Sequence, residues 1–206
     1  MGKIRRLLNI FGKDGRAFIV AMDHGTNAGA TRGLEDPLPV IESIEEGGAD
    51  AVIVNGGPGK GVEEVTFKNI ASAVAFGEDA GIPVVGEISP GGFDSTPEMR
   101  TLENIVPGAR IASELGVDVI KTIYKPGFRR VIEGCFVPVV VLGGERRGDE
   151  KDFLDSIRDA MDSGAAGVAI GRNVWGAAEP LKMAKALSAL IHDNASAEEA
   201  LTILKA

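Results

Sequence analysis

The chain has 206 residues, of which 44% are hydrophobic and 25% are charged, a composition typical of one globular domain. Its net charge of −8 disfavours binding to nucleic acid or to an anionic membrane, so an anionic ligand needs a local positive site. The single cysteine, Cys135, cannot form an internal disulfide and fits a reducing compartment. We see neither a signal-peptide pattern nor an apolar run of about 18 residues. We therefore expect one cytoplasmic domain over residues 1–206.

Short apolar runs alternate with helical patterns along the whole chain. The predicted strands are 17–22, 51–54, 83–87, 117–120, 137–142 and 167–170. The predicted helices are 3–11, 38–46, 63–79, 97–115, 128–133, 152–163, 178–192 and 196–204. Ser196, with a glutamate three residues later, has the pattern of a capping box. This alternation predicts repeated βαβ units around a parallel sheet of six strands.

Polar and glycine residues follow the predicted strands. The carboxyl ends of parallel strands meet at one edge of the sheet, where ligands bind in open and closed α/β sheets. The residues that this places at one edge are Asp23, His24, Asn55, Glu87, Ser89, Lys121, Tyr124, Gly143, Gly144, Gly171 and Arg172. The set contains an amine, carboxylates and a glycine pair beside an arginine, which favours an enzyme active site.

Lys121 is the first catalytic candidate because it ends an apolar run, Val117–Ile120. A lysine amine attacks a carbonyl only when it is neutral, and about one free lysine in a few thousand is neutral at pH 7. Removal from water favours the neutral form and so supplies a nucleophile. The protonated imine then acts as an electron sink, and a carboxylate such as Asp23 would take or give a hydroxyl proton. The alternative is a surface lysine that follows a strand.

Two glycine exits, Leu142–Glu145 and Ala169–Asn173, follow the last two strands. Glycine lets backbone N–H groups approach an anion closely, and Arg172 can bind a phosphate bidentately. These exits predict a phosphate site, although the glycines could simply permit tight turns. His24 is assigned to substrate positioning, because no residue stands at metal-ligand spacing from it. The loop Gly56–Gly61 lacks the Gly-Lys-Ser/Thr ending of a nucleotide phosphate loop.

Four motifs in chain order resemble the archaeal-type class I fructose-bisphosphate aldolase group, one of the Schiff-base aldolases that include deoxyribose-phosphate and tagatose-bisphosphate aldolases. The motifs are Ala21–Gly25, Val119–Tyr124, Val141–Gly144 and Gly167–Asn173. The resemblance implies a TIM-type (β/α) barrel and a homo-oligomer. We expect neither a metal nor a cofactor. It also implies that Lys121 is the Schiff-base lysine, that Asp23 is a catalytic carboxylate and that a phosphorylated substrate is held by Gly143, Gly144, Gly171 and Arg172.

The chain departs from the family pattern in two places. Ser89 stands where the family carries a proton-donating tyrosine, so Glu87 is the candidate for that proton and Ser89 is assigned to substrate binding. Tyr124, at the same strand end as Lys121, is included among the catalytic candidates. The family barrel has eight strands, and about two βα units are absent between Leu38–Gly48 and Val54–Val85. We therefore expect a TIM-type barrel shortened to about six βα units.

These features predict a lyase of the class I aldolase type, which cleaves or forms a carbon–carbon bond in a phosphorylated keto sugar or related carbonyl compound. One alternative is an acyltransferase or thiolase of the same family that uses coenzyme A. The other is a non-catalytic protein that binds a phosphate ligand or forms a structural oligomer.

Overall fold

The computed structural model describes residues 10–11, 13–21, 43, 46–47, 51–53, 67, 70–71, 74–75, 83–90, 97–144 and 149–206. The strands in these ranges are β1 (Ala17–Ala21), β2 (Ala51–Ile53), β3 (Val85–Ile88), β4 (Val119–Ile123), β5 (Val139–Leu142) and β6 (Gly167–Ile170). The helices are α5 (Leu102–Glu114), α6 (Arg129–Gly134), α7 (Glu150–Asp162), α8 (Arg172–Trp175), α9 (Pro180–His192) and α10 (Ala197–Lys205). From β3 onward a helix follows each strand, which confirms the predicted α/β alternation.

The described strands form one parallel sheet in the order β2-β1-β6-β5-β4-β3. The order follows the chain from β3 to β6 and then passes from β6 to β1. A doubly wound open sheet reverses its strand order at a switch point, whereas the strands of a barrel follow one another around a circle. The described strands therefore have the order of a (β/α) barrel, with β2 and β3 at the two ends of the series.

The two faces of the sheet bury different side chains, because successive residues of a strand point to opposite faces. One face packs against the helices in a large cluster that includes Phe18, Ile120 and Ile170. The other face, called the inner face below, carries a smaller cluster. Its members are Ala17, Ile19, Val119, Val140 and Ala169, with Ile10, Phe11 and Val85 packed against them.

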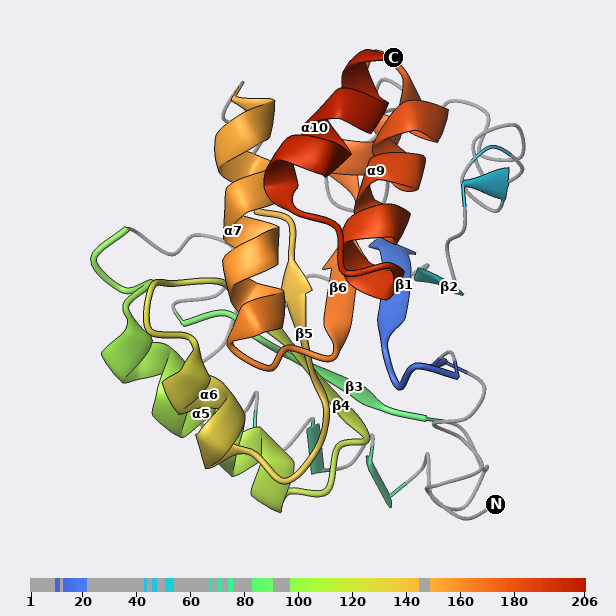
Figure 1. Ribbon diagram of the computed structural model, residues 1–206. Helices are drawn as coiled ribbons and strands as arrows, with labels where there is room; N and C mark the ends of the chain where they lie inside the picture. The colour runs from blue at the N-terminus through green and yellow to red at the C-terminus, as the bar shows by residue number, and fades with distance from the viewer. Residues whose placement is uncertain are drawn as a thin grey trace.

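The helices lie along the face of the sheet that carries the large core cluster. Figure 1 shows α7, α9 and α10 grouped beside β5, β6 and β1, and α5 and α6 grouped beside β3 and β4. Each helix buries an apolar stripe that joins the large core cluster, as with Ile105 of α5, Leu154 of α7 and Leu187 of α9. No helix among the described residues is long and apolar enough to cross a membrane.

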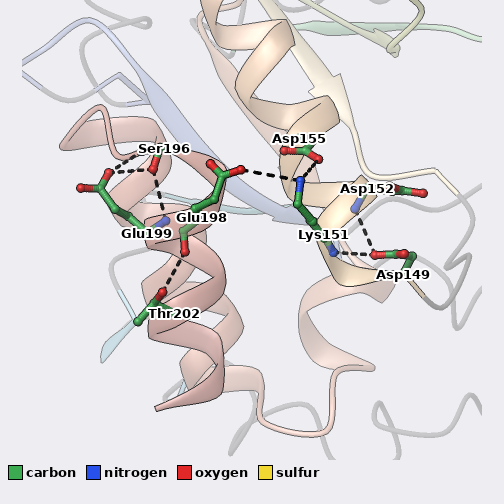
Figure 2. Close-up of polar contacts among 8 residues, drawn as sticks. All are labelled: Asp149, Lys151, Asp152, Asp155, Ser196, Glu198, Glu199 and Thr202. Carbon is green, nitrogen blue, oxygen red and sulfur yellow. Dashed lines mark hydrogen bonds and ion pairs between the residues drawn. The ribbon is translucent and has the colours of Figure 1, made fainter.

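Side chains cap the first turns of α7 and α10 (Figure 2). The Asp149 carboxylate accepts the backbone N–H groups of Lys151 at 2.8 Å and Asp152 at 3.2 Å. The Ser196 hydroxyl accepts the N–H of Glu199 at 3.2 Å, and the Glu199 carboxylate accepts the N–H of Ser196 at 2.7 Å. Both reciprocal bonds of the predicted capping box are present, so that prediction is confirmed.

An exposed ion-pair network connects the two capped helices (Figure 2). The Lys151 ammonium lies 2.6 Å from a carboxylate oxygen of Asp155 on its own helix and 3.7 Å from one of Glu198 on α10. The hydrogen bond with Asp155, followed by the charge of that carboxylate, raises the pKa of Lys151. Because these groups face solvent, water and salt screen their attraction, and the apolar contacts between α7 and α10 hold the helices together.

The element positions agree with the prediction except at particular ends. β4 begins two residues after the predicted start and continues to Ile123, so Lys121 lies inside the strand instead of following it. Residues 172–175, which lie outside every predicted strand and helix, form α8. The predicted helices 3–11, 38–46 and 63–79 fall mostly outside the described residues, where only isolated positions such as 43, 67 and 74 are described, as helical. The single-domain assignment stays a prediction.

Gly167 holds β6 against β1 at a distance that excludes any side chain. Its φ is +143°, and a Cβ placed on it would lie 1.8 Å from the carbonyl oxygen of Ala17. Gly15 also has a positive φ, +72°, but open space surrounds the corresponding Cβ position. We expect Gly167→Ala to lower the free energy of unfolding by about 3 kcal/mol or more, and Gly15→Ala by about 1 kcal/mol. Chemical denaturation measures both; equal losses would contradict the close contact between β1 and β6.

Candidate active site

A lysine and a glutamate from adjacent parallel strands meet on the inner face. Glu87 of β3 pairs in register with Lys121 of β4, and the Lys121 Nζ donates to Glu87 Oε2 at 2.9 Å. Only 8% of the Lys121 side chain is exposed, compared with 37% of the Glu87 side chain. The ammonium is therefore almost removed from water, and its carboxylate partner is in contact with solvent.

Two cross-strand bonds hold β3 and β4 in this register. The hydroxyl of buried Thr122, next to Lys121, donates to the carbonyl of Ile88 at 2.7 Å. At the other end of the strands, the carboxylate of buried Asp118 accepts the N–H of Val84 at 2.9 Å. These bonds supplement the backbone ladder and keep Glu87 opposite Lys121.

The pair has the chemistry that an imine-forming site needs. Transfer of one proton from the ammonium to the carboxylate gives a neutral amine beside a neutral carboxylic acid. The amine can then attack a carbonyl carbon, and the acid can protonate the oxygen that leaves as water. Sequence reasoning named Lys121 and Glu87 separately, but their hydrogen bond depends on the β3–β4 register and emerges only from the structure.

The two glycine exits also lie side by side. Gly143 and Gly144 follow β5, and Gly171 with exposed Arg172 follows β6 and begins α8. Gly144 has a φ of +65° and open space where a Cβ would be, a conformation that favours glycine. The adjacent pairing of β5 with β6 brings the exits together, as the sequence predicted. No described contact tests whether these four residues bind phosphate.

Asn173 is a polar residue to which sequence reasoning gave no role. Its side chain is buried, and its Nδ2 donates to the Gly143 carbonyl at 2.7 Å, so it connects the exit of β6 with the exit of β5. The signal in the sequence was an amide directly after the Gly171-Arg172 pair. This signal is weak because an asparagine after a glycine is also typical of an ordinary turn.

The remaining predicted site residues are placed differently or not described. Asp23 and His24 lie outside the described residues. Ser89 follows β3 and is partly exposed. The structure does not bring Tyr124 to the lysine–glutamate pair, because its hydroxyl donates to a carboxylate oxygen of Asp159 on α7. A catalytic role for Tyr124 therefore gains no support from its position.

Two other titratable residues lie away from the pair. Burial raises the pKa of half-buried Cys135 to about 11, with Arg110 opposing the shift, so this thiol is protonated at neutral pH and is a poor nucleophile. His192, at the end of α9, is mostly buried: its Nδ1 lies 2.9 Å from Asp14 Oδ2, and 21% of its side chain is exposed. Within the described ranges no cluster of three or more potential ligands could hold a metal ion.

Comparison with known proteins gives the site a context. A family profile described as DeoC/LacD family aldolase matches residues 59–177. An uncharacterized aldolase of Saccharolobus solfataricus is 30% identical, with all of both chains covered, in an alignment of 272 positions. A 2-amino-3,7-dideoxy-D-threo-hept-6-ulosonate synthase of Archaeoglobus fulgidus is 36% identical over 79% of this chain and 62% of its own. A 3-hydroxy-5-phosphonooxypentane-2,4-dione thiolase of Shigella flexneri is 36% identical over 69% of this chain and 54% of its own.

Two solved structures of archaeal fructose-1,6-bisphosphate aldolases are similar to the fold. One has a TM-score of 0.81 at 25% identity and covers 93% of this chain and 100% of its own. The other has a TM-score of 0.79 at 25% identity, covers 92% and 99%, and carries its catalytic lysine covalently bound to a carbinolamine intermediate. These matches confirm the TIM-type α/β fold and the predicted resemblance.

Tyr124, the only tyrosine of the chain, provides a spectroscopic check on its bond to Asp159. Burial, together with this hydrogen bond and the negative carboxylate, raises the pKa of Tyr124 to about 12. A raised pKa means that the folded environment of the protonated hydroxyl, its burial and its bond to Asp159, contributes stability that is fully present below pH 10, the ordinary tyrosine pKa, and is lost between about pH 10 and 12. Phenolate absorbance should titrate near 12 in the folded protein and near 10 in denaturant; a folded value near 10 would contradict the Asp159 contact.

Proposed function

Because the chain belongs to the DeoC/LacD family of aldolases and is a lyase-type enzyme, we propose that it makes or breaks a carbon–carbon bond through an imine at Lys121. The observation that carries this proposal is the contact of 2.9 Å between the buried Lys121 amine and the Glu87 carboxylate. The carbinolamine trapped on the catalytic lysine of a similar aldolase gives independent support. The substrate class proposed is a phosphorylated keto compound.

The first steps use the pair itself. Glu87 takes a proton from the Lys121 ammonium, and the neutral amine adds to the ketone carbon to give a carbinolamine. Protonation of its hydroxyl by the Glu87 acid expels water and leaves the protonated imine on Lys121. Ammonium and ketone thus become iminium and water, and the Glu87 carboxylate is restored for a second proton transfer.

The later steps use the imine as an electron sink. A carboxylate removes the proton from the hydroxyl on the carbon beta to the imine carbon, the carbon–carbon bond breaks, and an aldehyde leaves. We assign this proton to Asp23, as the sequence suggested. The electrons form an enamine, which takes a proton at carbon from the Glu87 side, and water then hydrolyses the imine to release the ketone. Glu87 supplies this proton because Ser89 stands at the position of the family tyrosine. Its exposed carboxylate first takes up a proton from solvent, and Asp23 returns the hydroxyl proton to solvent, so both carboxylates are restored.

Substrate binding is assigned to the polar residues around this edge. Gly143, Gly144, Gly171 and Arg172 are proposed to hold the phosphate, since exposed Arg172 and glycine backbone at adjacent strand exits suit an anion. Ser89 and His24 are proposed to contact the rest of the substrate. No cofactor is required for the chemistry described, and we propose that the enzyme acts in the cytoplasm as a homo-oligomer.

A thiolase-type acyl transfer to coenzyme A is the second candidate. The observation that favours it is the similarity to the Shigella flexneri protein named as a thiolase. The two activities differ in a requirement: an aldol cleavage proceeds without coenzyme A, whereas acyl transfer depends on it. Product formation with and without coenzyme A separates them.

Borohydride reduction tests the imine directly. We expect wild-type protein treated with dihydroxyacetone phosphate and borohydride to carry one covalent adduct, which mass spectrometry of peptides assigns to Lys121. Lys121→Arg keeps the positive charge but cannot form the imine, so it should carry none. Lys151→Arg, at an exposed lysine on α7, is the matched control and should react like wild type. An adduct on other lysines in Lys121→Arg would contradict the assignment.

Glu87→Gln tests the proton transfer, since glutamine keeps the size of the side chain but cannot accept the proton. We expect imine trapping to slow by about 100-fold, the scale of general acid–base catalysis. Glu103→Gln, which removes an exposed carboxylate paired with Arg130 on the helix side, should trap at the wild-type rate. An unchanged rate in Glu87→Gln would show that another group activates the amine.

A further inference from the structure

Asn173 makes a bond that the chemistry at Lys121 does not explain. It lies in the first turn of α8, is 5% exposed, and donates from Nδ2 to the carbonyl of Gly143, 30 residues earlier in the chain. A buried amide is costly unless it is hydrogen-bonded, and this bond satisfies one of the amide hydrogens of Asn173. The bond therefore fixes a particular backbone group of the β5 exit.

The group that it fixes is the peptide between Gly143 and Gly144. Peptide units are planar, and no cis peptide bond occurs among the described residues, so the carbonyl and the N–H of this unit point in opposite directions. Because Asn173 holds the Gly143 carbonyl, the N–H of Gly144 must point away from Asn173.

The loop is packed tightly on one side and open on the other. A Cβ on Gly143 would lie 2.8 Å from Asn173 Nδ2 and 2.8 Å from Ile170 Cγ2, so this residue is pressed against β6 and α8. A Cβ on Gly144 would meet nothing within 4 Å, and Gly144 is exposed. Gly143 is therefore packed against the protein, whereas Gly144 is accessible to a ligand.

We propose that Asn173 is a positioning residue for substrate phosphate: by holding the Gly143 carbonyl, it directs the Gly144 N–H at a phosphate oxygen. This inference rests on the proposed function and adds to it a residue that does not touch the substrate. Without the Asn173 amide, the Gly143–Gly144 peptide rotates, since both residues are glycines with little torsional restraint. The Gly144 N–H then no longer points at the phosphate oxygen, and the affinity of the enzyme for the phosphate falls.

The experiment compares ligands with and without phosphate. The variants are Asn173→Ala and Asn173→Leu, the second of which fills the space of the amide. The matched control is Asn104→Ala, which removes a similar bond of 2.9 Å from an asparagine amide on α5 to the carbonyl of Met99, which lies before that helix. For each protein, borohydride trapping is measured against the concentration of dihydroxyacetone phosphate and of dihydroxyacetone, and binding of inorganic phosphate is measured by calorimetry. Thermal unfolding checks that each variant is folded.

We expect both Asn173 variants to need about tenfold more dihydroxyacetone phosphate for half-maximal trapping and to bind inorganic phosphate about tenfold more weakly, the effect of one lost bond to a charged group. Trapping of dihydroxyacetone should be unchanged, as should every value for Asn104→Ala. Equal losses with both ketones, or phosphate binding like wild type, would overturn the inference. Wild-type protein that traps neither ketone would contradict the proposed function, and phosphate binding would then decide the role of Asn173 alone.

Discussion

The register between β3 and β4 is the constraint on which the site depends. A shift of one residue between paired strands turns every side chain of the shifted strand to the other face. In the observed register Glu87 stands beside Lys121 on the inner face, and Thr122 points to the helix-facing core, where its hydroxyl bonds the Ile88 carbonyl. A shifted strand would place a charge in the helix-facing core and an unbonded hydroxyl on the inner face. The observed register of β3 and β4 therefore satisfies the backbone pairing, the hydrogen bond of buried Thr122 and the contact of Lys121 with Glu87.

The cost of burying the Lys121 ammonium explains why its partner is held so closely. An isolated ammonium in an apolar environment is strongly unfavourable, and removing one member of a buried ion pair leaves the other without compensation. The surroundings of Lys121 on the inner face include Val119 and Val140, which offer no hydrogen bond. Glu87 therefore offsets the burial of the Lys121 ammonium. In the proposed mechanism the same contact also provides the proton transfer that frees the amine.

Local pattern predicted the strands, most helix positions and the candidate lysine, because buried parallel strands are continuous Val and Ile runs that a charge interrupts visibly. It could not predict the bond between Lys121 and Glu87, which are 34 residues apart and meet only through the register. Tyr124, predicted as a catalytic residue, shows where a simple rule was available: residues three apart along an extended segment face opposite sides, which argues against a place beside Lys121. Asn173 could not be identified, since its partner is a backbone carbonyl on another loop.

The order of the described strands explains why the two members of the pair differ in exposure. β4 lies between β3 and β5, so Lys121 is enclosed by a strand on each side, whereas β3 ends the series and leaves 37% of the Glu87 side chain exposed. The alignment with the Saccharolobus solfataricus aldolase has 272 positions, more than the 206 residues of this chain. That aldolase therefore has residues without a counterpart here. The strands β3 to β6 nevertheless lie within the matched family region. They are consecutive in the chain and in the sheet, and they carry Glu87, Lys121 and both glycine exits. The matched family region therefore contains the part of the barrel in which Lys121 is buried and Glu87 stays in contact with solvent.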